Sequence, residues 1–496
     1  MNNENKFIIG IDLGNLTSTI SYFDFNQMNI DVVDVSGGYG KVSVPTVVSY
    51  NVDTEDWIFG EYAILNKGFG NEIIIENIIE NLGKGIIYSI NNINISVTLA
   101  LSKFILFLLE NIKNINPNAS IEGIVLSTSS YANEEDIKEA FKLANIDHLL
   151  LKIASDKECI LKSYFYENDI LGDKVLIVDY SNRQLRASVY TIEKDGKVKC
   201  IKTFFNDKIG QQRLFNITKN LITKKFLEET GKIDLTEYEK NNLDSFVYQQ
   251  FDIIFQRQTL SDIKLYYNFF YPPFQKVITK QELFDIISFF ENEINIFFNS
   301  LFESININEN HIKNIILTGG GIEIDFIHKF IKSRFNIETN FKGKAKRFIS
   351  DGACIVACQE LGILPKDKMY IEDLDQIGYN MGIFIKDNNN IKFEPFVYKG
   401  SFIWQNFDKK VFTLTKNKNI EIDIASEEDN SFKTLEKIKL NLNDYSQFDN
   451  RDIKTIRFLI YIQFKNNKEM IFNIEDFGFG EIYPKTDFKQ QFIINI

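Results

Sequence analysis

The sequence predicts a duplicated α/β fold followed by a separate all-β domain, and three observations carry this prediction. A pattern occurs twice, at Phe7–Phe25 and Val175–Ile192: a buried apolar strand ends in aspartate, turns tightly and continues as a second strand. A run of three glycines joins a strand to a helix within Ile315–Ile331. From about residue 379 onward, apolar and polar residues alternate with the period of a strand.

The repeated hairpins place one acidic residue at the end of each first strand. Asp12 ends the apolar run of the first hairpin, and Asp179 ends that of the second. Backbone N–H groups in tight turns and at helix N-termini bind anions. Two such hairpins facing each other, with a glycine-rich turn beside them, are what an actin-like nucleotide clamp requires.

Strand and helix segments alternate after the first hairpin, which is typical of an α/β domain with crossover packing. The segments predicted to contain strands are Lys41–Asn51, Trp57–Lys67 (which leads into a helix), Ile121–Ser130 and Leu149–Asp156. The segments predicted to be helical are about 133–144 and most of 211–302, with a break at Tyr266–Phe274.

The character of the sequence changes at Pro365. A proline and four acidic residues there are typical of an interdomain connector, which we place at 365–378. Beyond it, Thr455–Phe464 puts five apolar side chains on one face at period two, and a polar turn leads into a second alternating strand at 470–476. Residues 379–496 are therefore predicted to be all-β.

Composition limits the partners and the compartment. The formal net charge is −12 and no block of Lys and Arg stands out, which argues against nucleic acid as the main partner. The polar N-terminus has no secretory apolar region, and no apolar stretch approaches the roughly 18 residues that would cross a bilayer. Four cysteines in 496 residues do not make a disulfide framework. We expect a cytoplasmic protein that binds neither nucleic acid nor membrane.

Common metal and phosphate motifs do not explain the sequence. Its three histidines lie far apart, and there is no HExxH or CxxC pattern. Cys354 and Cys358 are four residues apart in a predicted helix, where a buried helix face is the simpler interpretation than a metal pair. The segment Gly37–Ser43 lacks the glycine spacing of a Walker A loop.

Several segments together resemble the seventy-kilodalton heat-shock chaperone (DnaK-like) family over nearly the whole chain. GIDLGNLTS at Gly10–Ser18 resembles the family's first phosphate hairpin, and RQTLS at Arg257–Ser261 its adenine-contacting helix. LTGGGIEI at Leu317–Ile324 is similar to its adenosine turn, and SDGACIVACQ at Ser350–Gln359 to its closing helix. The order and spacing of these segments carry the resemblance more than any one of them does.

The resemblance implies a fold and a set of partners. It implies an actin-like, ribonuclease-H-like duplicated, two-lobed nucleotide-binding domain at 1–364, a linker at 365–378, and an all-β sandwich similar to a substrate-binding domain at 379–496. In that family ATP or ADP with Mg²⁺ lies between the lobes. We expect a β-domain without the family's helical lid. The partner that the resemblance implies is an unfolded or extended protein segment, or a dedicated protein partner.

The resemblance also assigns candidate site residues. Asp12 and Asp179 would organise Mg²⁺ through water and, with Asp156, form the catalytic acidic set, a role suited to carboxylate oxygens. The nucleotide would contact Gly14, Asn15, Leu16, Ser181, Asn182, Arg183, Arg257, Ser261, Gly319, Gly320 and Gly321. A peptide slot would be lined by Phe393, Phe412, Ile420 and Ile422. Apolar residues on alternating strands also commonly form a core, and this alternative stays open.

The sequence departs from the family at positions that matter for catalysis. Ser181–Gln184 stands where the family has three glycines and a threonine, and glycine-only φ values there would cost about 1 kcal/mol each. Ile64 occupies the position of the catalytic lysine, a loss worth about 2–4 kcal/mol by analogy with other electrostatic catalytic groups. Ser129 replaces the switch proline, and Lys346 replaces an acidic residue near the adenosine. We therefore expect weak or no ATP hydrolysis.

These features bear on four possible functions. The first is a DnaK-like chaperone that binds ATP and a client segment with weak or no ATPase activity. The second is a pseudo-ATPase scaffold for protein–protein interaction, which the departures favour over an active ATPase. An actin-like filament protein is less consistent with a C-terminal β-domain, and a sugar or carboxylate kinase lacks a motif here. Fold alone does not decide among them.

Overall fold

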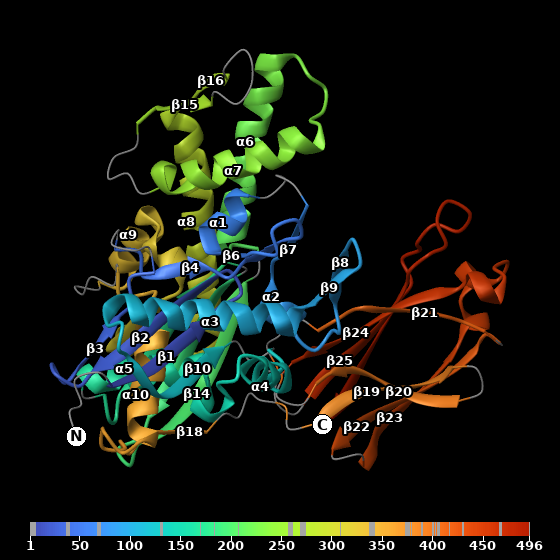
Figure 1. Cartoon of the computed structure of the whole chain (residues 1–496). Helices are drawn as coiled ribbons and strands as arrows, with labels where there is room; N and C mark the ends of the chain where they lie inside the picture. The colour runs from blue at the N-terminus through green and yellow to red at the C-terminus, as the bar shows by residue number, and fades with distance from the viewer. Residues whose placement is uncertain are drawn as a thin grey trace. The chain divides into compact units, whose positions relative to one another are not determined.

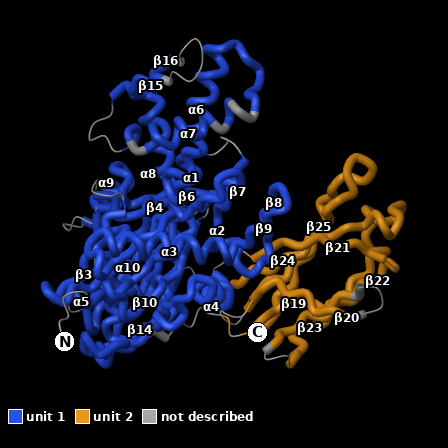
Figure 2. Tube along the Cα trace, viewed as in Figure 1, with its two compact units in different colours: residues 1–372 blue, residues 373–496 orange. Residues whose placement is uncertain are grey.

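A computed structural model describes most of the chain, in two compact units that span residues 1–372 and 373–496 (Figure 2). The described residues are 6–35, 40–66, 71–128, 132–168, 170–182, 184–206, 208–255, 261–267, 274–307, 309–336, 343–372, 377, 379–387, 390–398, 401, 403, 407–415, 417–428, 431–465 and 469–495.

Two large sheets, with helices packed around them, organise the first unit (Figure 1). The first has the order β11-β10-β1-β2-β3 with β4 on β2, and the second has the order β17-β12-β13-β14-β18. In each, three consecutive strands run antiparallel, and a later parallel strand, β10 or β17, joins the first of them. The sequence repeat is thus a repeat of sheet topology.

The strands of the first sheet are β1 (Lys6–Leu13), β2 (Thr17–Asp24), β3 (Asn29–Val32), β4 (Ser43–Pro45), β10 (Ser120–Thr128) and β11 (Leu150–Ser155). Those of the second sheet are β12 (Lys174–Tyr180), β13 (Leu185–Ile192), β14 (Lys197–Asn206), β17 (Asn314–Thr318) and β18 (Tyr370–Glu372). The strand β18 lies inside the connector predicted at 365–378, because its backbone extends the second sheet by parallel pairing with β14.

Helices cover both faces of the first sheet, which explains why β1 is apolar nearly throughout. Ile9 and Ile11 belong to the core cluster shared with α3, while Ile8 belongs to the cluster shared with α10. Successive side chains of a strand point to opposite faces, so the apolar run before Asp12 is buried on both sides. The helices of this region are α3 (Val97–Ile115), α4 (Glu134–Leu143), α5 (Asp156–Glu167) and α10 (Phe348–Glu360).

The second sheet shares one large core with four helices, α6 (Gln211–Thr230), α7 (Glu237–Phe255), α8 (Lys280–Ile305) and α9 (Asp325–Arg334). Within the region predicted to be helical, β15 (Ile263–Tyr267) and β16 (Phe274–Ile278) form an antiparallel pair around the predicted break. Aromatic and β-branched residues dominate both strands, which favours extended backbone there.

Smaller elements complete the first unit. They are β5 (Val48–Asn51), β6 (Trp57–Phe59), β7 (Glu72–Ile75), β8 (Ile87–Ile90), β9 (Ile93–Ser96), α1 (Gly60–Leu65) and α2 (Ile78–Asn81). Among the described residues, no helix is long and apolar enough to cross a membrane.

The second unit consists of two four-stranded antiparallel sheets, with the orders β20-β19-β22-β23 and β21-β24-β25-β26. Side chains from both sheets form a single core cluster. The strands are β19 (Asn380–Asp387), β20 (Asn390–Val397), β21 (Lys410–Thr413), β22 (Asn419–Glu428), β23 (Ser431–Asn441), β24 (Arg457–Phe464), β25 (Glu469–Asp476) and β26 (Lys489–Asn495).

A β-bulge in the first of these sheets creates a cluster of aromatic side chains outside the core. The register between β22 and β23 shifts at Ile424/Ala425, so Leu435 is unpaired and the alternation of β23 reverses beyond it. Phe432 therefore lies on the opposite face from the buried Ile438. It contacts Phe384 and Phe393, with ring centroids 5.2 and 5.1 Å away. Phe432 is 49% exposed.

Candidate functional site

Three aspartates predicted from the sequence lie at strand ends of the two sheets. Asp12 is next to the last residue of β1 and pairs with Ser127 on the parallel strand β10. Asp156 directly follows β11 and is the first residue of α5, whose N-cap is Ser155. Because β1, β10 and β11 are parallel, their carboxyl ends share one edge of the first sheet. Asp179 has the equivalent place near the end of β12 in the second sheet.

An arginine joins two of these aspartates. Arg186 lies on β13 directly opposite Asp179 in the antiparallel register. Its Nη2 atom is 3.0 Å from Asp179 Oδ2 and 2.6 Å from Asp156 Oδ2. The guanidinium therefore links the second sheet to the edge of the first, and only 9% of the Arg186 side chain is exposed.

The sequence carried a signal for Arg186 that the hairpin pattern did not use. All residues of β13 from Leu185 to Tyr190 are buried, and arginine is the only charged residue among them. Arginine is almost never fully buried without a partner. An arginine in a strand predicted to be buried therefore indicates a buried carboxylate nearby, and Asp179 on the preceding strand was the candidate.

Burial and mutual charge set the protonation of this group. Burial, together with the charges of Asp156 and Asp179, raises the pKa of Asp12 well above its usual value. Burial also raises the pKa of Asp179, to about 6, although Arg186 acts against it. For Asp156 burial acts upward as well, but the charge and hydrogen bond of Arg186 lower its pKa overall. The pKa of Arg186 is raised despite its burial, so the guanidinium stays charged.

The first hairpin turn is held by contacts within the protein. The Thr46 hydroxyl donates to the carbonyl of Gly14 at 2.7 Å, and the Thr46 N–H donates to the carbonyl of Leu16 at 2.7 Å. The Asn15 side chain lies 3.2 Å from Asn77 Oδ1 and accepts from the N–H of Glu80 at 3.4 Å, at the start of α2. Gly14 permits the tight turn, since a Cβ there would lie 2.4 Å from the Thr17 carbonyl oxygen.

The described residues of the second hairpin turn, Ser181, Asn182 and Gln184, avoid the strain expected from the lack of glycine. Ser181 donates its N–H to the carbonyl of Gln184 at 2.9 Å, and no described residue of the turn has positive φ. The carbonyls of Ser181 and Asn182 accept from the first N–H groups of α6, those of Gln211 and Gln212, at 3.1 and 2.8 Å. The turn therefore provides acceptors for the first N–H groups of this helix, which have no partner within the helix.

The glycine-rich turn follows β17, beside the end of β12. Thr318 pairs with Asp179, and Gly319 has φ of 90°. A Cβ on Gly319 would lie 2.5 Å from Asp179 Oδ1, and one on Gly321 would lie 1.8 Å from the Tyr180 ring. Both glycines are therefore required by packing inside the protein. Gly320 differs, because its nearest neighbours would be Gln211 Oε1 at 3.7 Å and Lys346 Cε at 3.9 Å.

Two other residues singled out in the sequence, Ser261 and Ile64, lie at smaller elements of the first unit. Ser261 is exposed just before β15, and Ile64 is half-buried in α1. The end of α7 contacts the start of α9, with 5.8 Å between the ring centroids of Phe255 and Phe326. The predictions for Ser129, Arg183 and Arg257 fall outside the described residues.

The acidic residues fit a divalent cation poorly. One oxygen of Asp156 accepts from Arg186, and the other accepts from the N–H of Lys157 at 2.8 Å. One oxygen of Asp179 also accepts a hydrogen bond from Arg186, while the other oxygen faces the backbone of Gly319. Within the part of the chain that the structure describes, no group of three or more His, Cys, Asp or Glu side chains is arranged to hold a metal ion. We therefore assign no magnesium-dependent step to these residues.

The four predicted peptide-binding residues lie in different surroundings. Ile422 is buried in the core of the second unit, and Phe412 and Ile420 pack against that core. Phe393 belongs instead to the aromatic cluster with Phe384 and Phe432 on the other face of its sheet. Only Phe393 is thus placed on a face that the core of this unit does not use.

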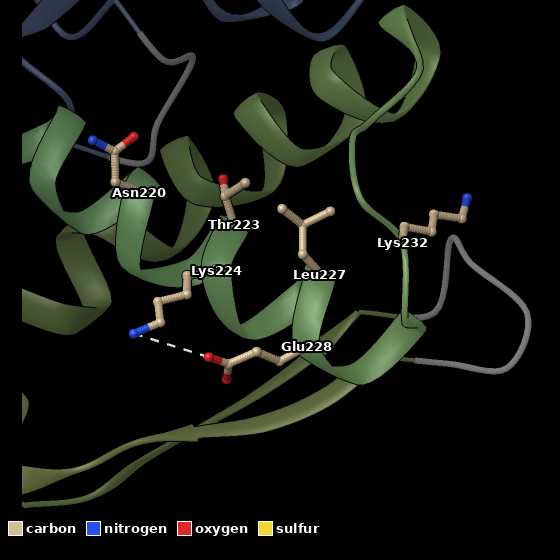
Figure 3. A pocket seen from close by; sticks show the side chains of 6 residues that line it. All are labelled: Asn220, Thr223, Lys224, Leu227, Glu228 and Lys232. Atoms are coloured by element: carbon tan, nitrogen blue, oxygen red, sulfur yellow. Dashed lines mark ion pairs between the residues drawn. The ribbon is translucent and has the colours of Figure 1, made fainter.

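A surface hollow of about 430 Å³ lies along α6 (Figure 3). It contains none of the predicted site residues. Its lining residues are Asn220, Thr223, Lys224, Leu227, Glu228 and Lys232. Lys224 and Glu228 are a weak surface pair 3.9 Å apart, so the hollow offers few fixed polar groups for a ligand.

Comparisons with known proteins support a distant relationship to DnaK. A family model described as the C-terminal part of a family of unknown function (DUF5716) matches residues 30–270, and one described as a domain of unknown function (DUF8552) matches residues 376–496. The chain is 23% identical over 440 residues to the chaperone protein DnaK of Thermosipho melanesiensis, which covers 86% of this chain and 70% of that protein. The chain is 22% identical over 440 residues to DnaK of Thermosipho africanus, and this match covers the same share of each chain. It is 23% identical over 437 residues to DnaK of Thermotoga petrophila, a match that again covers 86% of this chain and 70% of that protein.

Proposed function

We propose that this protein is a DnaK-like, chaperone-type protein that binds ATP or ADP in its first unit and an extended protein segment in its second. The observation that carries the nucleotide part is the convergence of Asp12 and Asp179, near strand ends of the two large sheets, with Asp156 at the start of α5. The distant similarity to DnaK over most of the chain supports it. In this proposal the two sheets are the cores of two actin-like lobes.

The nucleotide is proposed to lie against Gly320. The glycine turn, the start of α6 and Lys346 meet there, and a Cβ at Gly320 would make only ordinary contacts with Gln211 and Lys346. Lys346 supplies a positive charge and Gln211 a polar side chain beside that position. The two neighbouring glycines are fully explained by internal packing, so Gly320 is the position where a ligand would meet the backbone.

A size series at Gly320 tests the nucleotide site. We expect Gly320→Ala to bind ATP within about threefold of the unchanged protein, since its Cβ would meet only ordinary contacts. We expect Gly320→Leu to weaken ATP binding about tenfold or more, because its side chain would fill the proposed space, a loss of about 1.4 kcal/mol. Isothermal titration with ATP and ADP measures this, with thermal unfolding as the fold control. Equal affinity in all three proteins would place the nucleotide elsewhere or exclude it.

The second candidate function, a pseudo-ATPase scaffold, is favoured by specific observations. A phosphoryl-transfer site works by positioning the phosphate and by stabilising its charge. Here Ile64 occupies the position of the catalytic lysine, and Arg186 binds two of the three aspartates. Phosphate release with protein in excess over ATP distinguishes the two. Release no faster than in buffer, with nucleotide bound, supports the scaffold. Measurable release supports a slow ATPase.

The second unit is proposed to bind its segment at the cluster of Phe384, Phe393 and Phe432. Aromatic side chains bury much apolar area at low entropy cost and often dominate such contacts. We expect Phe432→Ser to weaken binding of a fluorescent, extended apolar peptide about tenfold. The matched control is Ile493→Ser, which removes a 61% exposed apolar side chain from β26 in the other sheet. Equal losses in both variants would show non-specific apolar binding.

A further inference from the structure

We infer that the guanidinium of Arg186 takes the position between the carboxylates where a divalent cation would lie, so that nucleotide binding at this site needs no metal. The inference rests on the proposed nucleotide binding, but it makes a separate statement about the protein without nucleotide. It names Arg186 as the residue that determines the metal requirement.

Geometry is the first support. The same Nη2 atom lies 2.6 Å from Asp156, at the start of α5, and 3.0 Å from Asp179, on β12 of the second sheet. A guanidinium holds its charge at all accessible pH values and is well suited to carboxylates. A metal ion that bound these two oxygens would have to break both of these hydrogen bonds from Arg186.

Burial makes that displacement costly. The exposed fractions of the Arg186, Asp156 and Asp179 side chains are 9%, 19% and 15%. A buried guanidinium moved away from its carboxylates would lose its counter-ions in surroundings of low polarity. The Gly319 backbone packs against Asp179, so this carboxylate has little freedom to turn toward another cation.

The local charge is the second, independent support. Lys157, the second residue of α5, is buried, with an exposed fraction of 3%, and its charge acts on Asp156. Two cations, Arg186 and Lys157, thus accompany three aspartates. A divalent ion is attracted less strongly to such a group than to three uncompensated carboxylates, and a phosphate nearby is repelled less.

Two measurements on the 496-residue protein test the inference. The first compares ATP binding in Mg²⁺ with ATP binding in EDTA, and we expect the affinities to agree within about twofold. The second titrates Mn²⁺ alone, followed by electron paramagnetic resonance. We expect no binding by the unchanged protein up to millimolar Mn²⁺, and stoichiometric binding by Arg186→Met, in which the carboxylates lose their cation. Arg186→Lys keeps the charge and should behave like the unchanged protein.

The outcomes separate this inference from the proposed function. ATP binding that requires Mg²⁺, or Mn²⁺ binding by the unchanged protein, overturns the inference. Failure of Arg186→Met to gain Mn²⁺ also overturns it, provided that this variant shows the thermal unfolding of a folded protein. If Arg186→Met does not fold, the comparison of Mg²⁺ with EDTA and the Mn²⁺ titration of the unchanged protein decide alone. If no ATP binds under any condition, the proposed function fails, and the Mn²⁺ titrations still decide the role of Arg186.

Discussion

Replacing Asp476 with asparagine is expected to lower the free energy of unfolding of the second unit by about 3–5 kcal/mol. Arg451 Nη1 lies 3.0 and 2.9 Å from the two carboxylate oxygens of Asp476, and the exposed fractions of the two side chains are 4% and 0%. The N–H groups of Gly478 and Thr486 also donate to this carboxylate, each at 3.0 Å. An asparagine at this position would leave a buried guanidinium without its counter-charge and would place an amide N–H₂ among donors.

The two tryptophans allow this loss to be assigned to one unit. Trp57 lies in the first unit and Trp404 in residues 373–496, so the Trp57→Phe background leaves a single reporter in the second unit. Urea unfolding followed by its fluorescence gives the free energy. The double variant Arg451→Met/Asp476→Asn should lose less than the sum of the two single variants, because neither partner is left charged and alone. Strictly additive losses would show that the pair contributes nothing beyond its separate contacts.

The pH dependence gives a second check on the same carboxylate. Burial acts to raise the pKa of Asp476, but the donated hydrogen bonds from Gly478, Thr486 and Arg451 lower it below its usual value of about 3.9. A group with a lowered folded-state pKa contributes stability that is complete above its unfolded-state pKa and is lost as the pH falls through the folded-state value. The stability difference between the unchanged protein and Asp476→Asn should therefore shrink below about pH 4. A difference that stays constant from about pH 7 to about pH 3 would contradict this.

The acidic residues of the candidate site could be predicted because they interrupt apolar runs at strand ends. Asp12 and Asp179 each follow several buried residues, and such a pattern fixes both the strand and its end. Arg186 was missed because its partners lie on other elements: Asp179 on the preceding strand, and Asp156 at the start of α5, just after a strand of the other sheet. No local period of the sequence encodes a contact between two sheets. The rule that buried arginine needs a carboxylate would have indicated it.

The face of each strand in the second unit was harder to predict than the strands themselves. Alternation predicted β24 and β25, because period two is a local property of the sequence. A peptide slot that includes both Phe393 and Ile422 requires those side chains to share a face, and the register of the paired strands within their sheet decides that. The bulge at Leu435 shows the difficulty, since one unpaired residue reverses the alternation and moves Phe432 out of the core.

Replacing Gly10 with alanine is expected to destabilise the first unit by about 3 kcal/mol, at the upper end of overpacking. A Cβ at Gly10 would lie 2.2 Å from both the Cys354 nitrogen and the Ser350 carbonyl oxygen, which are backbone atoms of α10. The strand cannot retreat, because β1 is paired with β10 on one side and β2 on the other. The helix is also held from its far side, where a Cβ on Gly352 would lie 1.8 Å from the Cys159 carbonyl oxygen in α5.

The matched control is Gly320→Ala, the same chemical change where the Cβ would meet its nearest atoms at 3.7 and 3.9 Å. Its stability should stay within about 0.5 kcal/mol of the unchanged protein. In the Trp404→Phe background, Trp57 reports on the first unit in urea unfolding. Asp12 lies two residues beyond Gly10 and so on the same face of β1. The contact between β1 and α10 therefore also positions this carboxylate. If Gly10→Ala lowers the free energy of unfolding by less than about 0.5 kcal/mol, the helix does not lie against the strand in this way.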